Sequence, residues 1–299
     1  MKRIAFLPLF CCLVITTEST MAQTLVAPGA EIVKLADGFG FTEGPTANSK
    51  GDVYFVDDPN CKIHVWSVSE KKCSVFVSES AHANGMYFDK TDNLYVCEGG
   101  TGSVVMYTPD GKRTVVANKF GNRHFNKPND LWIDPKGGIY FTDPQYGDNF
   151  YVVQGGQHVY YILPDRNKII RVIETGEGKG FVQPNGIIGT PDGKLLYVAD
   201  IGGKMIYRYN IQADGTLTGQ QPFAPFQTDG MTIDEKGNVY LAGANAVVVY
   251  SPSGNLVERI EVPESWVANV CFGGKDFKTL FITAISGLYA IEMSVKGAK

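Results

Sequence analysis

The chain has 299 residues, of which 44% are hydrophobic and 19% are charged, and its formal net charge is −4. This is the composition of a globular protein with one large domain or two small ones. The slight excess of acid gives no basic surface for nucleic acid or anionic lipid, so we expect neither nucleic acid nor membrane among the partners of the mature chain. The 34 Gly, 15 Tyr and 17 Phe residues favour a β protein rich in turns.

The first 22 residues have the pattern of a secretory signal peptide. Two basic residues precede an apolar run from Ile4 to Ile15, and a polar stretch then ends in small residues, with cleavage expected after Ala22. The apolar run is too short to anchor the mature protein in a bilayer. We therefore expect an exported protein, periplasmic or secreted, in which residues 23–299 form a single domain.

Four cysteines follow the predicted signal peptide: Cys61, Cys73, Cys97 and Cys271. An even number in an oxidising compartment permits disulfides. Cys61 and Cys73, however, flank a predicted hairpin whose turn lies near residues 69–72, so they should be staggered rather than opposed. Buried free thiols are an equal alternative, and the sequence leaves both open.

Six short apolar strand signatures recur along the chain. They read GDVYFVD, DNLYVCE, GGIYFTD, KLLYVAD, GNVYLAG and KTLFITA, with the aromatic residues Tyr54, Tyr95, Tyr140, Tyr197, Tyr240 and Phe281. Successive aromatic residues lie roughly 41 to 57 positions apart, close to the length of a four-stranded propeller blade. Each signature is a near-continuous apolar run, as expected for a strand buried between neighbouring blades. The predicted fold is all-β, a six-bladed β-propeller.

The two ends of the chain are expected to close the propeller together. The last repeat, from Trp266 to Met293, has room for only three strands, whereas residues 30–36 are strand-like and lack a blade of their own. We expect residues 30–36 to supply the outer strand of the last blade, because this pairing removes an open sheet edge.

An oxygen-bearing side chain stands 11 or 12 residues before each aromatic residue of the repeats. These side chains belong to Glu43, Asn84, Asn129, Asn185, Asp229 and Asn269. Equivalent positions on the innermost strands of a propeller surround its central channel, so the six side chains should form a ring of oxygen atoms. Such a donor set without histidine suits a hard divalent cation, Ca²⁺ best, with Mg²⁺, Mn²⁺ and Zn²⁺ as alternatives. For Asn84 and Asn269, capping of turns is the competing interpretation.

A second acidic register follows each of the first four aromatic residues by three positions. It consists of Asp57, Glu98, Asp143 and Asp200. Because these residues stand where a strand ends in a turn, we expect them to accept hydrogen bonds from neighbouring backbone amides. The sequence contains no serine-hydrolase elbow, nucleotide-binding loop, Cys-x-x-Cys pair or His-Glu-x-x-His motif. The oxygen ring is therefore the candidate site.

The motifs around the ring resemble those of the SMP-30/gluconolactonase family. FTEGP, KPNDL, QPNGI and TDGM occur in the family's order, and the resemblance runs from about residue 38 to residue 291. It implies a six-bladed propeller that binds one divalent cation and hydrolyses a sugar lactone. It also implies that Glu43, Asn185 and Asp229 are metal ligands, that Asn129 completes the site directly or through water, and that Asp229 is the catalytic base.

The resemblance further implies contacts between the sugar lactone and Asn84, Lys127 and Asn129. Lys127 stands where animal members of the family have arginine, and Gly99 stands where many bacterial members have histidine. The long third interval contains the loop QYGDNFYVVQGGQ, which could cover the pocket and set its specificity.

The implied mechanism uses the cation to polarise the lactone carbonyl and a carboxylate to take a proton from water. A carboxylate bound to a dication is a weak base, so Asp229 needs a free oxygen or a metal-bound water that is already acidified. The alternative is a non-catalytic propeller that binds a ligand or partner around a structural calcium ion. A paraoxonase-like esterase is disfavoured, because the four histidines, His64, His82, His124 and His158, all fall outside the ring register.

Overall fold

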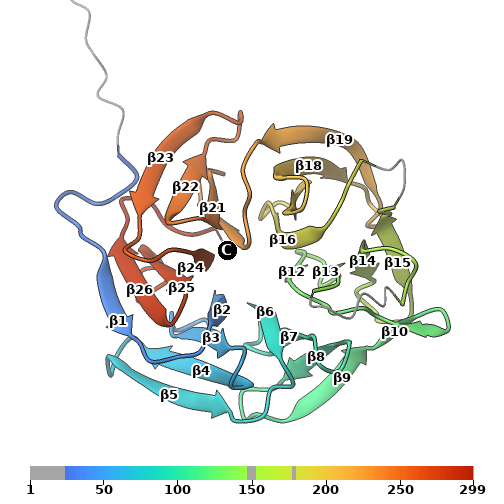
Figure 1. The fold of residues 1–299 in the computed structure, drawn as a ribbon, viewed down its shortest axis with the longest axis horizontal. Helices are drawn as coiled ribbons and strands as arrows, with labels where there is room; N and C mark the ends of the chain where they lie inside the picture. Colours follow the sequence, from blue (N-terminus) through green and yellow to red (C-terminus); the bar gives the residue numbers. More distant parts are fainter. Residues whose placement is uncertain (1–23, 147–152, 177–179, 299) are drawn as a thin grey trace, which may run out of the picture.

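The computed structural model describes residues 24–146, 153–176 and 180–298, and this part of the chain folds into strands and turns. Six four-stranded antiparallel sheets surround a central axis, as Figure 1 shows. The predicted six-bladed propeller is confirmed. A helix that could span a membrane is not found among the described residues. The predicted signal peptide, residues 1–22, lies outside them.

Each blade starts with its innermost strand and ends with its outermost. The first three blades are β2 (Thr42–Ala47), β3 (Val53–Asp57), β4 (Lys62–Ser67) and β5 (Lys72–Val77); β6 (Ala83–Phe88), β7 (Leu94–Glu98), β8 (Ser103–Tyr107) and β9 (Arg113–Ala117); and β12 (Leu131–Ile133), β13 (Ile139–Asp143), β14 (His158–Ile162) and β15 (Ile169–Ile173). The next two are β16 (Pro184–Gly189), β17 (Leu195–Asp200), β18 (Met205–Ile211) and β19 (Leu217–Ala224); and β20 (Met231–Ile233), β21 (Val239–Gly243), β22 (Ala246–Tyr250) and β23 (Leu256–Glu261). The sixth is β24 (Val267–Gly273), β25 (Thr279–Ala284), β26 (Gly287–Glu292) and β1 (Val33–Ala36), and a small hairpin, β10 (Lys119–Phe120) and β11 (Arg123–His124), follows β9.

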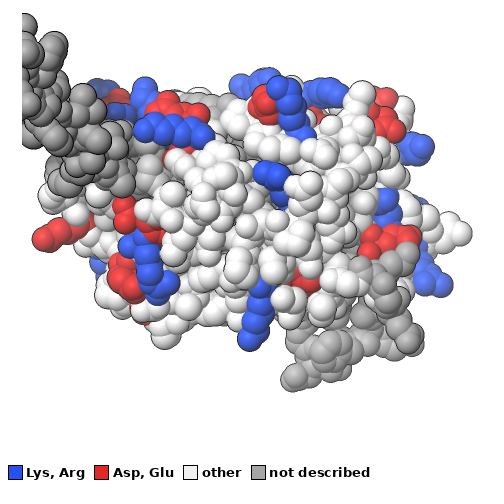
Figure 2. Space-filling view, turned by 90° about the horizontal axis from the view of Figure 1, so that it is seen from above, with Lys and Arg blue, Asp and Glu red and all other residues white. Residues whose placement is uncertain are grey.

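The hydrophobic core lies between the blades. Every residue of β7, β13 and β21 is buried, whereas the outermost strands β5 and β23 are largely exposed. Tyr140, Tyr197 and Tyr240 of the repeat signatures are at most 1% exposed. Around the edge of the molecule, on the side shown in Figure 2, acidic and basic side chains are interspersed. The continuous apolar runs of the sequence are thus explained by burial on both faces of the second strands.

Among the described residues the cysteines are free thiols, Cys61, Cys73, Cys97 and Cys271, so the disulfide alternative is not realised in the structure. Cys97 and Cys271 are buried, and burial raises the pKa of both thiols. They therefore contribute to packing as neutral side chains.

Three residues of the second acidic register hold the segments that lead into the innermost strands. Asp57 accepts the backbone N–H of Gly40 at 2.9 Å, Asp143 accepts that of Asn126 at 3.0 Å, and Asp200 accepts backbone N–H groups just before β16. The expectation of backbone hydrogen bonds is confirmed for these three residues. Each carboxylate fixes the chain immediately before a ring residue of its own blade.

Glu98 departs from the expectation for this register. Its two carboxylate oxygens accept hydrogen bonds from Arg113 Nε at 2.9 Å and Nη2 at 2.5 Å, and Tyr107 donates its hydroxyl at 3.0 Å. A longer side chain reaches past the turn to the outer strands, so Glu98 joins β7, β8 and β9 instead of the entering segment.

The predicted closure between the two chain ends is confirmed. β1 pairs antiparallel with β26, with Val33 opposite Ala290, and becomes the outermost strand of the sixth blade. The strand occupies the second half of the segment expected, residues 30–36. Just before it, Leu25 is buried in the core of the fifth and sixth blades.

We expect deletion of residues 24–36 to destabilise the whole propeller in one cooperative transition. The deletion exposes the edge of β26 and removes Leu25, whose burial alone stabilises the fold by roughly 2 kcal/mol. A chain of this size should lose about 5 °C or more in Tm. Scanning calorimetry can test this, and an unchanged Tm, or separate melting of one blade, would contradict it.

Candidate functional site

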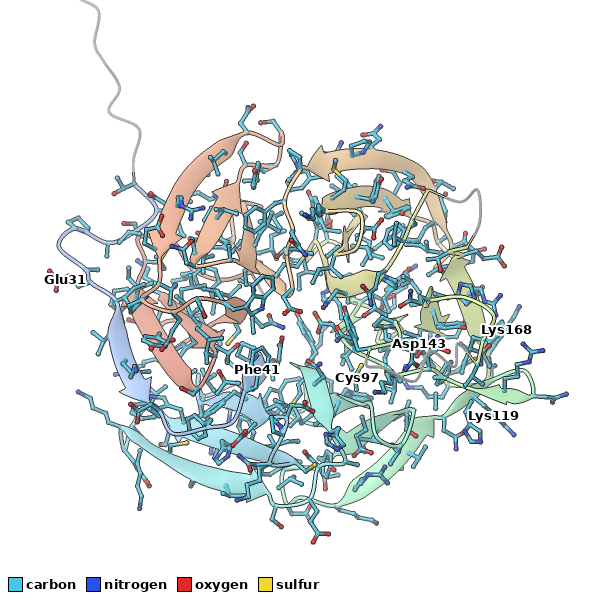
Figure 3. All side chains as sticks on the ribbon, viewed as in Figure 1. Glu31, Phe41, Cys97, Lys119, Asp143 and Lys168 are labelled. Atoms are coloured by element: carbon cyan, nitrogen blue, oxygen red, sulfur yellow. The ribbon has the colours of Figure 1, made fainter. Side chains whose placement is uncertain are left out.

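The six ring residues all lie at the start of the innermost strand of their blade. Figure 3 shows side chains of every blade directed toward the space around the axis. The four ring residues that are nearly fully buried are Glu43, Asn129, Asn185 and Asn269. Asp229 is half-buried and precedes β20 by two residues. The register found in the sequence is therefore a true ring in space.

The pairing of the innermost strands is irregular at the ring. The register between β2 and β3 shifts between Glu43 and Thr46, and that between β16 and β17 shifts between Pro184 and Ile187. Irregularities of this kind re-aim side chains and are common beside functional sites. Here they interrupt the regular alternation of side chains between the two faces of the sheet, beside the ring residues.

Glycines that follow ring residues allow neighbouring blades to approach at the axis. The Gly85 N–H donates to the carbonyl of Asn129 at 2.6 Å, and the Gly186 N–H donates to the carbonyl of Asp229 at 2.8 Å. A Cβ on Gly186 would lie 2.4 Å from that same Asp229 oxygen. The Asn-Gly pairs are thus required by contact between blades, which the turn-capping interpretation did not include.

Two carboxylates of the ring face each other without a basic partner among the described residues. Glu43 Oε2 accepts the N–H of Gly44 at 2.7 Å and the Asn269 side-chain amide at 3.2 Å. Burial, and then the charge of Asp229, raise the pKa of Glu43 well above its usual value. Burial also raises the pKa of Asp229 to about 6, although Trp266 Nε1 donates to its Oδ2 at 3.0 Å. The channel therefore concentrates negative charge that is only partly compensated.

Asp130 is a third acidic residue at the ring, and the sequence reasoning missed it. Its Oδ1 accepts the N–H of Leu131 at 2.9 Å, and its Oδ2 accepts the N–H of Ile187, in the next blade, at 3.2 Å. Burial raises its pKa to about 7, with a further contribution from the charge of Asp229. Asp130 stands where the neighbouring repeats have glycine, and this exception in the motif could have identified it.

Tyr146 is a second residue that the sequence reasoning did not single out. Its hydroxyl accepts the Asn185 side-chain amide at 2.7 Å. Burial and the charge of Asp229 raise its pKa, which keeps the phenol neutral. Tyr146 belongs to the long loop expected to cover the pocket, of which residues 147–152 lie outside the described part of the chain.

The predicted substrate residues differ in their surroundings. Lys127 is exposed and its Nζ donates to the backbone carbonyl of Tyr146 at 2.9 Å, so it braces the loop beside the ring. The side-chain amides of Asn84 and Asn129 have no hydrogen-bond partner within the described residues. Both amides are thus available to a bound molecule, which their position at the channel favours.

The ring fits a hard cation by the chemistry of its donors. Glu43 and Asp229 supply carboxylates whose pKa is raised mainly by burial, and Asn129 and Asn185 supply amides. In the described ranges no cluster of three or more His, Cys, Asp and Glu residues has the geometry of a metal site. A cation at the ring would therefore depend on amide as well as carboxylate oxygens.

Comparison with known proteins gives a consistent result. The family model described as the SMP-30/Gluconolactonase/LRE-like region matches residues 41–286. A gluconolactonase from Zymomonas mobilis is 27% identical over 316 residues, which cover 95% of this chain and 87% of that protein. A pentonolactonase from Haloferax volcanii is 27% identical over 261 residues, covering 82% and 81%. The structure of a gluconolactonase from Xanthomonas campestris has the same fold, with a TM-score of 0.81 at 24% identity and coverage of 90% and 91%.

We expect a divalent cation to stabilise the protein more at neutral pH than in acid. In the cation-free protein the pKa values of Asp229 and Asp130, about 6 and about 7, lie above the usual value for Asp. The folded state then binds more protons than the unfolded state, so its stability falls as the pH rises from about 4 to about 7. A cation relieves this repulsion only where the carboxylates are ionised.

Thermal unfolding with and without saturating Ca²⁺, at about pH 5 and about pH 7.5, measures this effect. The increase in Tm should be several degrees at the higher pH and much smaller at the lower. Glu43→Gln keeps the shape of the side chain, loses one charge and should reduce the increase at neutral pH. Equal increases at both pH values would contradict a carboxylate site.

Proposed function

The chain is a member of the SMP-30/gluconolactonase family, and from this membership and the geometry of the ring we propose that it hydrolyses sugar lactones with one divalent cation. The observation that carries the proposal is the convergence of Glu43, Asn185 and Asp229 at the start of three innermost strands. The charge of Asp229 contributes to the raised pKa of Glu43, which places the two carboxylates near each other. The lactonase relatives support the reaction class.

Glu43, Asn185 and Asp229 would hold the cation, and the amide of Asn129 would complete the site directly or through water. Ca²⁺ is the ion that this mixture of carboxylate and amide oxygens favours. When bound, the ion would polarise the lactone carbonyl and stabilise the negative charge that develops on its oxygen. The Asn185 side chain donates its amide N–H to the hydroxyl of Tyr146. This hydrogen bond orients the amide and leaves its oxygen free to bind the cation.

Asp229 is the residue best suited to take the proton from the attacking water. Its raised pKa, about 6, makes it a stronger base than an ordinary aspartate at neutral pH. The indole N–H of Trp266 fixes the orientation of the carboxylate. A bound cation would lower this pKa again. Asp229 can therefore act as the base only if one of its oxygens stays free to accept the proton from water.

The groups around the ring suit a polyhydroxylated substrate. Asn84 and Asn129 offer amides that can donate and accept hydrogen bonds, and neither amide is engaged by a described residue. The hydroxyl of Tyr146 lies beside Asn185. Lys127 would contribute to substrate binding indirectly, because its ammonium donates to the backbone carbonyl of Tyr146. A sugar lactone presents both the carbonyl for the reaction and the hydroxyl groups for these contacts.

We expect Asp229→Asn to lower kcat for gluconolactone on the order of 10²–10⁴-fold, the usual contribution of a positioned general base. The amide keeps an oxygen donor and the volume of the side chain, so metal should still bind. Activity is measured with saturating Ca²⁺, and Asp276→Asn, at an exposed aspartate after β24, is the matched control that should keep full activity.

Two results would change this interpretation. If Asp229→Asn regains normal turnover when Ca²⁺ is in excess, Asp229 is only a ligand and the water needs another base. If the unmodified protein hydrolyses no aldonolactone with Ca²⁺, Mg²⁺, Mn²⁺ or Zn²⁺, the lactonase proposal is wrong and the non-catalytic binding propeller replaces it.

Removing the hydroxyl of Tyr146 should weaken the site without disturbing the fold. Tyr146→Phe leaves the amide of Asn185 without its acceptor, and one such hydrogen bond is worth about 1 kcal/mol, or about fivefold in Ca²⁺ affinity. Calorimetric titration of Ca²⁺ gives this number independently of activity. Tyr209→Phe is the control, because the Tyr209 hydroxyl is buried without a partner within the described residues. Equal Ca²⁺ affinity in the two variants would remove Tyr146 from the site.

We also propose that residues 1–22 direct export of the protein. The support is the basic start, the apolar run and the small residues before the expected cleavage point. N-terminal sequencing of the protein expressed in a bacterium should give a chain that starts at Gln23 in the periplasmic or culture fraction. A cytoplasmic chain that retains Met1 would show that the segment is not a signal peptide.

A further inference from the structure

The channel has a second cavity at the end opposite the ring. Its volume is about 640 Å³, within the range of roughly 300–1,000 Å³ found for small-molecule sites. The lining includes Ser49 and Lys90, which follow β2 and β6, and Pro135 and Pro191, which follow β12 and β16. The innermost strands therefore begin at the oxygen ring and end at this cavity.

A belt of apolar side chains separates the cavity from the ring. Met86, Leu131, Ile187 and Met231 are each at most 4% exposed and line a narrow space of about 40 Å³ between the two ends. Each of these residues lies two positions after the ring residue of its blade. A molecule in the cavity would therefore not reach the carboxylates of the ring.

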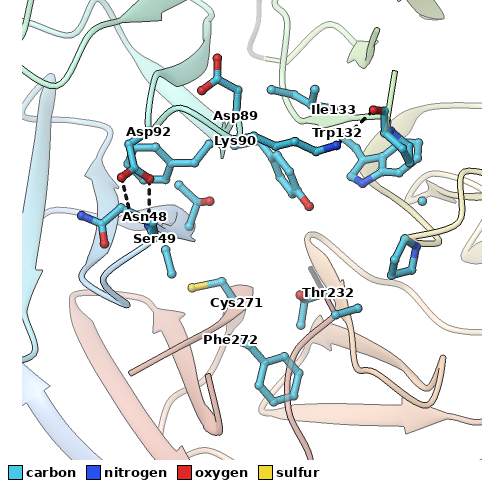
Figure 4. A pocket seen from close by; sticks show the side chains of 18 of the residues that line it. Asn48, Ser49, Asp89, Lys90, Asp92, Trp132, Ile133, Thr232, Cys271 and Phe272 are labelled. Atoms are coloured by element: carbon cyan, nitrogen blue, oxygen red, sulfur yellow. Dashed lines mark hydrogen bonds between the residues drawn. The ribbon is translucent and has the colours of Figure 1, made fainter. Parts of the chain in front are cut away.

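The walls of the cavity are aromatic and apolar. Trp132, Phe272 and Cys271 surround it together with Thr232, as Figure 4 shows. The indole of Trp132 packs against the backbone of Gly189. A Cβ at position 189 would lie 2.2 Å from the indole. Such flat walls suit a flat apolar group, because aromatic surfaces bury a large area against one another.

Two hydroxyl groups in the lining are free to bind a ligand. Thr46 is only 6% exposed, and its hydroxyl has no hydrogen-bond partner among the residues that the structure describes. The hydroxyl of Thr232, from the fifth blade, likewise has none in that part of the chain. Neither hydroxyl is among the fully buried polar atoms that lack a partner, so both are open to the cavity and can donate to or accept from a bound molecule.

The rim of the cavity carries charges of both signs, from Lys90 and Lys136 and from Asp89 and Asp92. Lys90 reaches along the rim (Figure 4), where its Nζ donates to the Pro135 carbonyl at 3.3 Å, and it forms no ion pair with a described residue. The nearby carboxylates are already engaged: Asp89 accepts hydrogen bonds within its own turn, and Asp92 accepts the N–H and hydroxyl of Ser49. The oxygens of these carboxylates are directed at their own donors, whereas the Lys90 ammonium has a single backbone acceptor, so a carboxylate that approaches Lys90 can pair with it.

We propose that this cavity is a second binding site, for a small flat apolar molecule that carries a carboxylate. The apolar body would pack against Trp132 and Phe272, and the carboxylate would face Lys90. The site is distinct from the proposed lactonase site and does not depend on that activity.

Calorimetric titration of 2-naphthoate and 2-naphthamide into the mature chain tests the proposal, because the two probes share a shape and differ in charge. We expect one saturable site, with naphthoate bound about fivefold more tightly than naphthamide, the effect of roughly 1 kcal/mol from a partly exposed charge pair. Lys90→Met should remove this difference. Lys236→Met, an exposed lysine after β20 that does not line the cavity, should leave it unchanged.

Three results would overturn the proposal. The first is no saturable binding of either compound up to its solubility limit. The second is equal affinity of naphthoate and naphthamide, since the carboxylate is part of the proposal. The third is naphthoate binding that Asp229→Asn weakens while Lys90→Met leaves it unchanged, which would place the molecule in the ring.

Discussion

The structure depends on the close approach of six innermost strands around one axis. Gly85 and Gly186 allow this approach, because their N–H groups bond directly to the carbonyls of Asn129 and Asp229 in the next blade. A side chain at either glycine would overlap the neighbouring strand and open the ring. The side chains that precede the glycines are then held at fixed positions on the channel wall, whatever their chemistry.

This geometry places like charges together at the centre of the fold. Burial raises the pKa values of Glu43, Asp130 and Asp229, and the charge of Asp229 adds to the rise at Glu43 and Asp130. The apolar contacts between blades and the closure by β1 and β26 supply the stability that offsets the burial of these charges. The negative charge that destabilises the cation-free protein would also attract a cation. Stability and function are therefore linked through the same oxygen atoms.

The two ends of the channel differ because the innermost strands change character along their length. At the start of these strands the pairing is irregular and the side chains carry oxygen, whereas toward their end Trp132 and Phe272 contribute aromatic atoms to the lining of the cavity. Met86 and Met231 lie between these regions and narrow the passage that joins them. One set of strands thus forms two chemically different ends of the channel.

The sequence by itself determined the number of blades, the positions of the ring residues, the closure by the first strand and the role of Asp57, Asp143 and Asp200. The blades, the ring and the acidic register follow from a period of about one blade, since a repeated unit places equivalent residues at equivalent positions. The closure follows from the last repeat, which has room for only three strands. The contacts of Tyr146 with Asn185 and of Trp266 with Asp229 were decided only by the tertiary structure.

These contacts join residues from different blades or from a loop that has no counterpart in the other repeats, so no periodicity predicts them. The same holds for the raised pKa of Asp130, which depends on the burial of its carboxylate and on the charge of Asp229 from another blade. A local sequence pattern determines the position of each side chain on its strand. The arrangement of the blades around the axis decides which side chains come into contact.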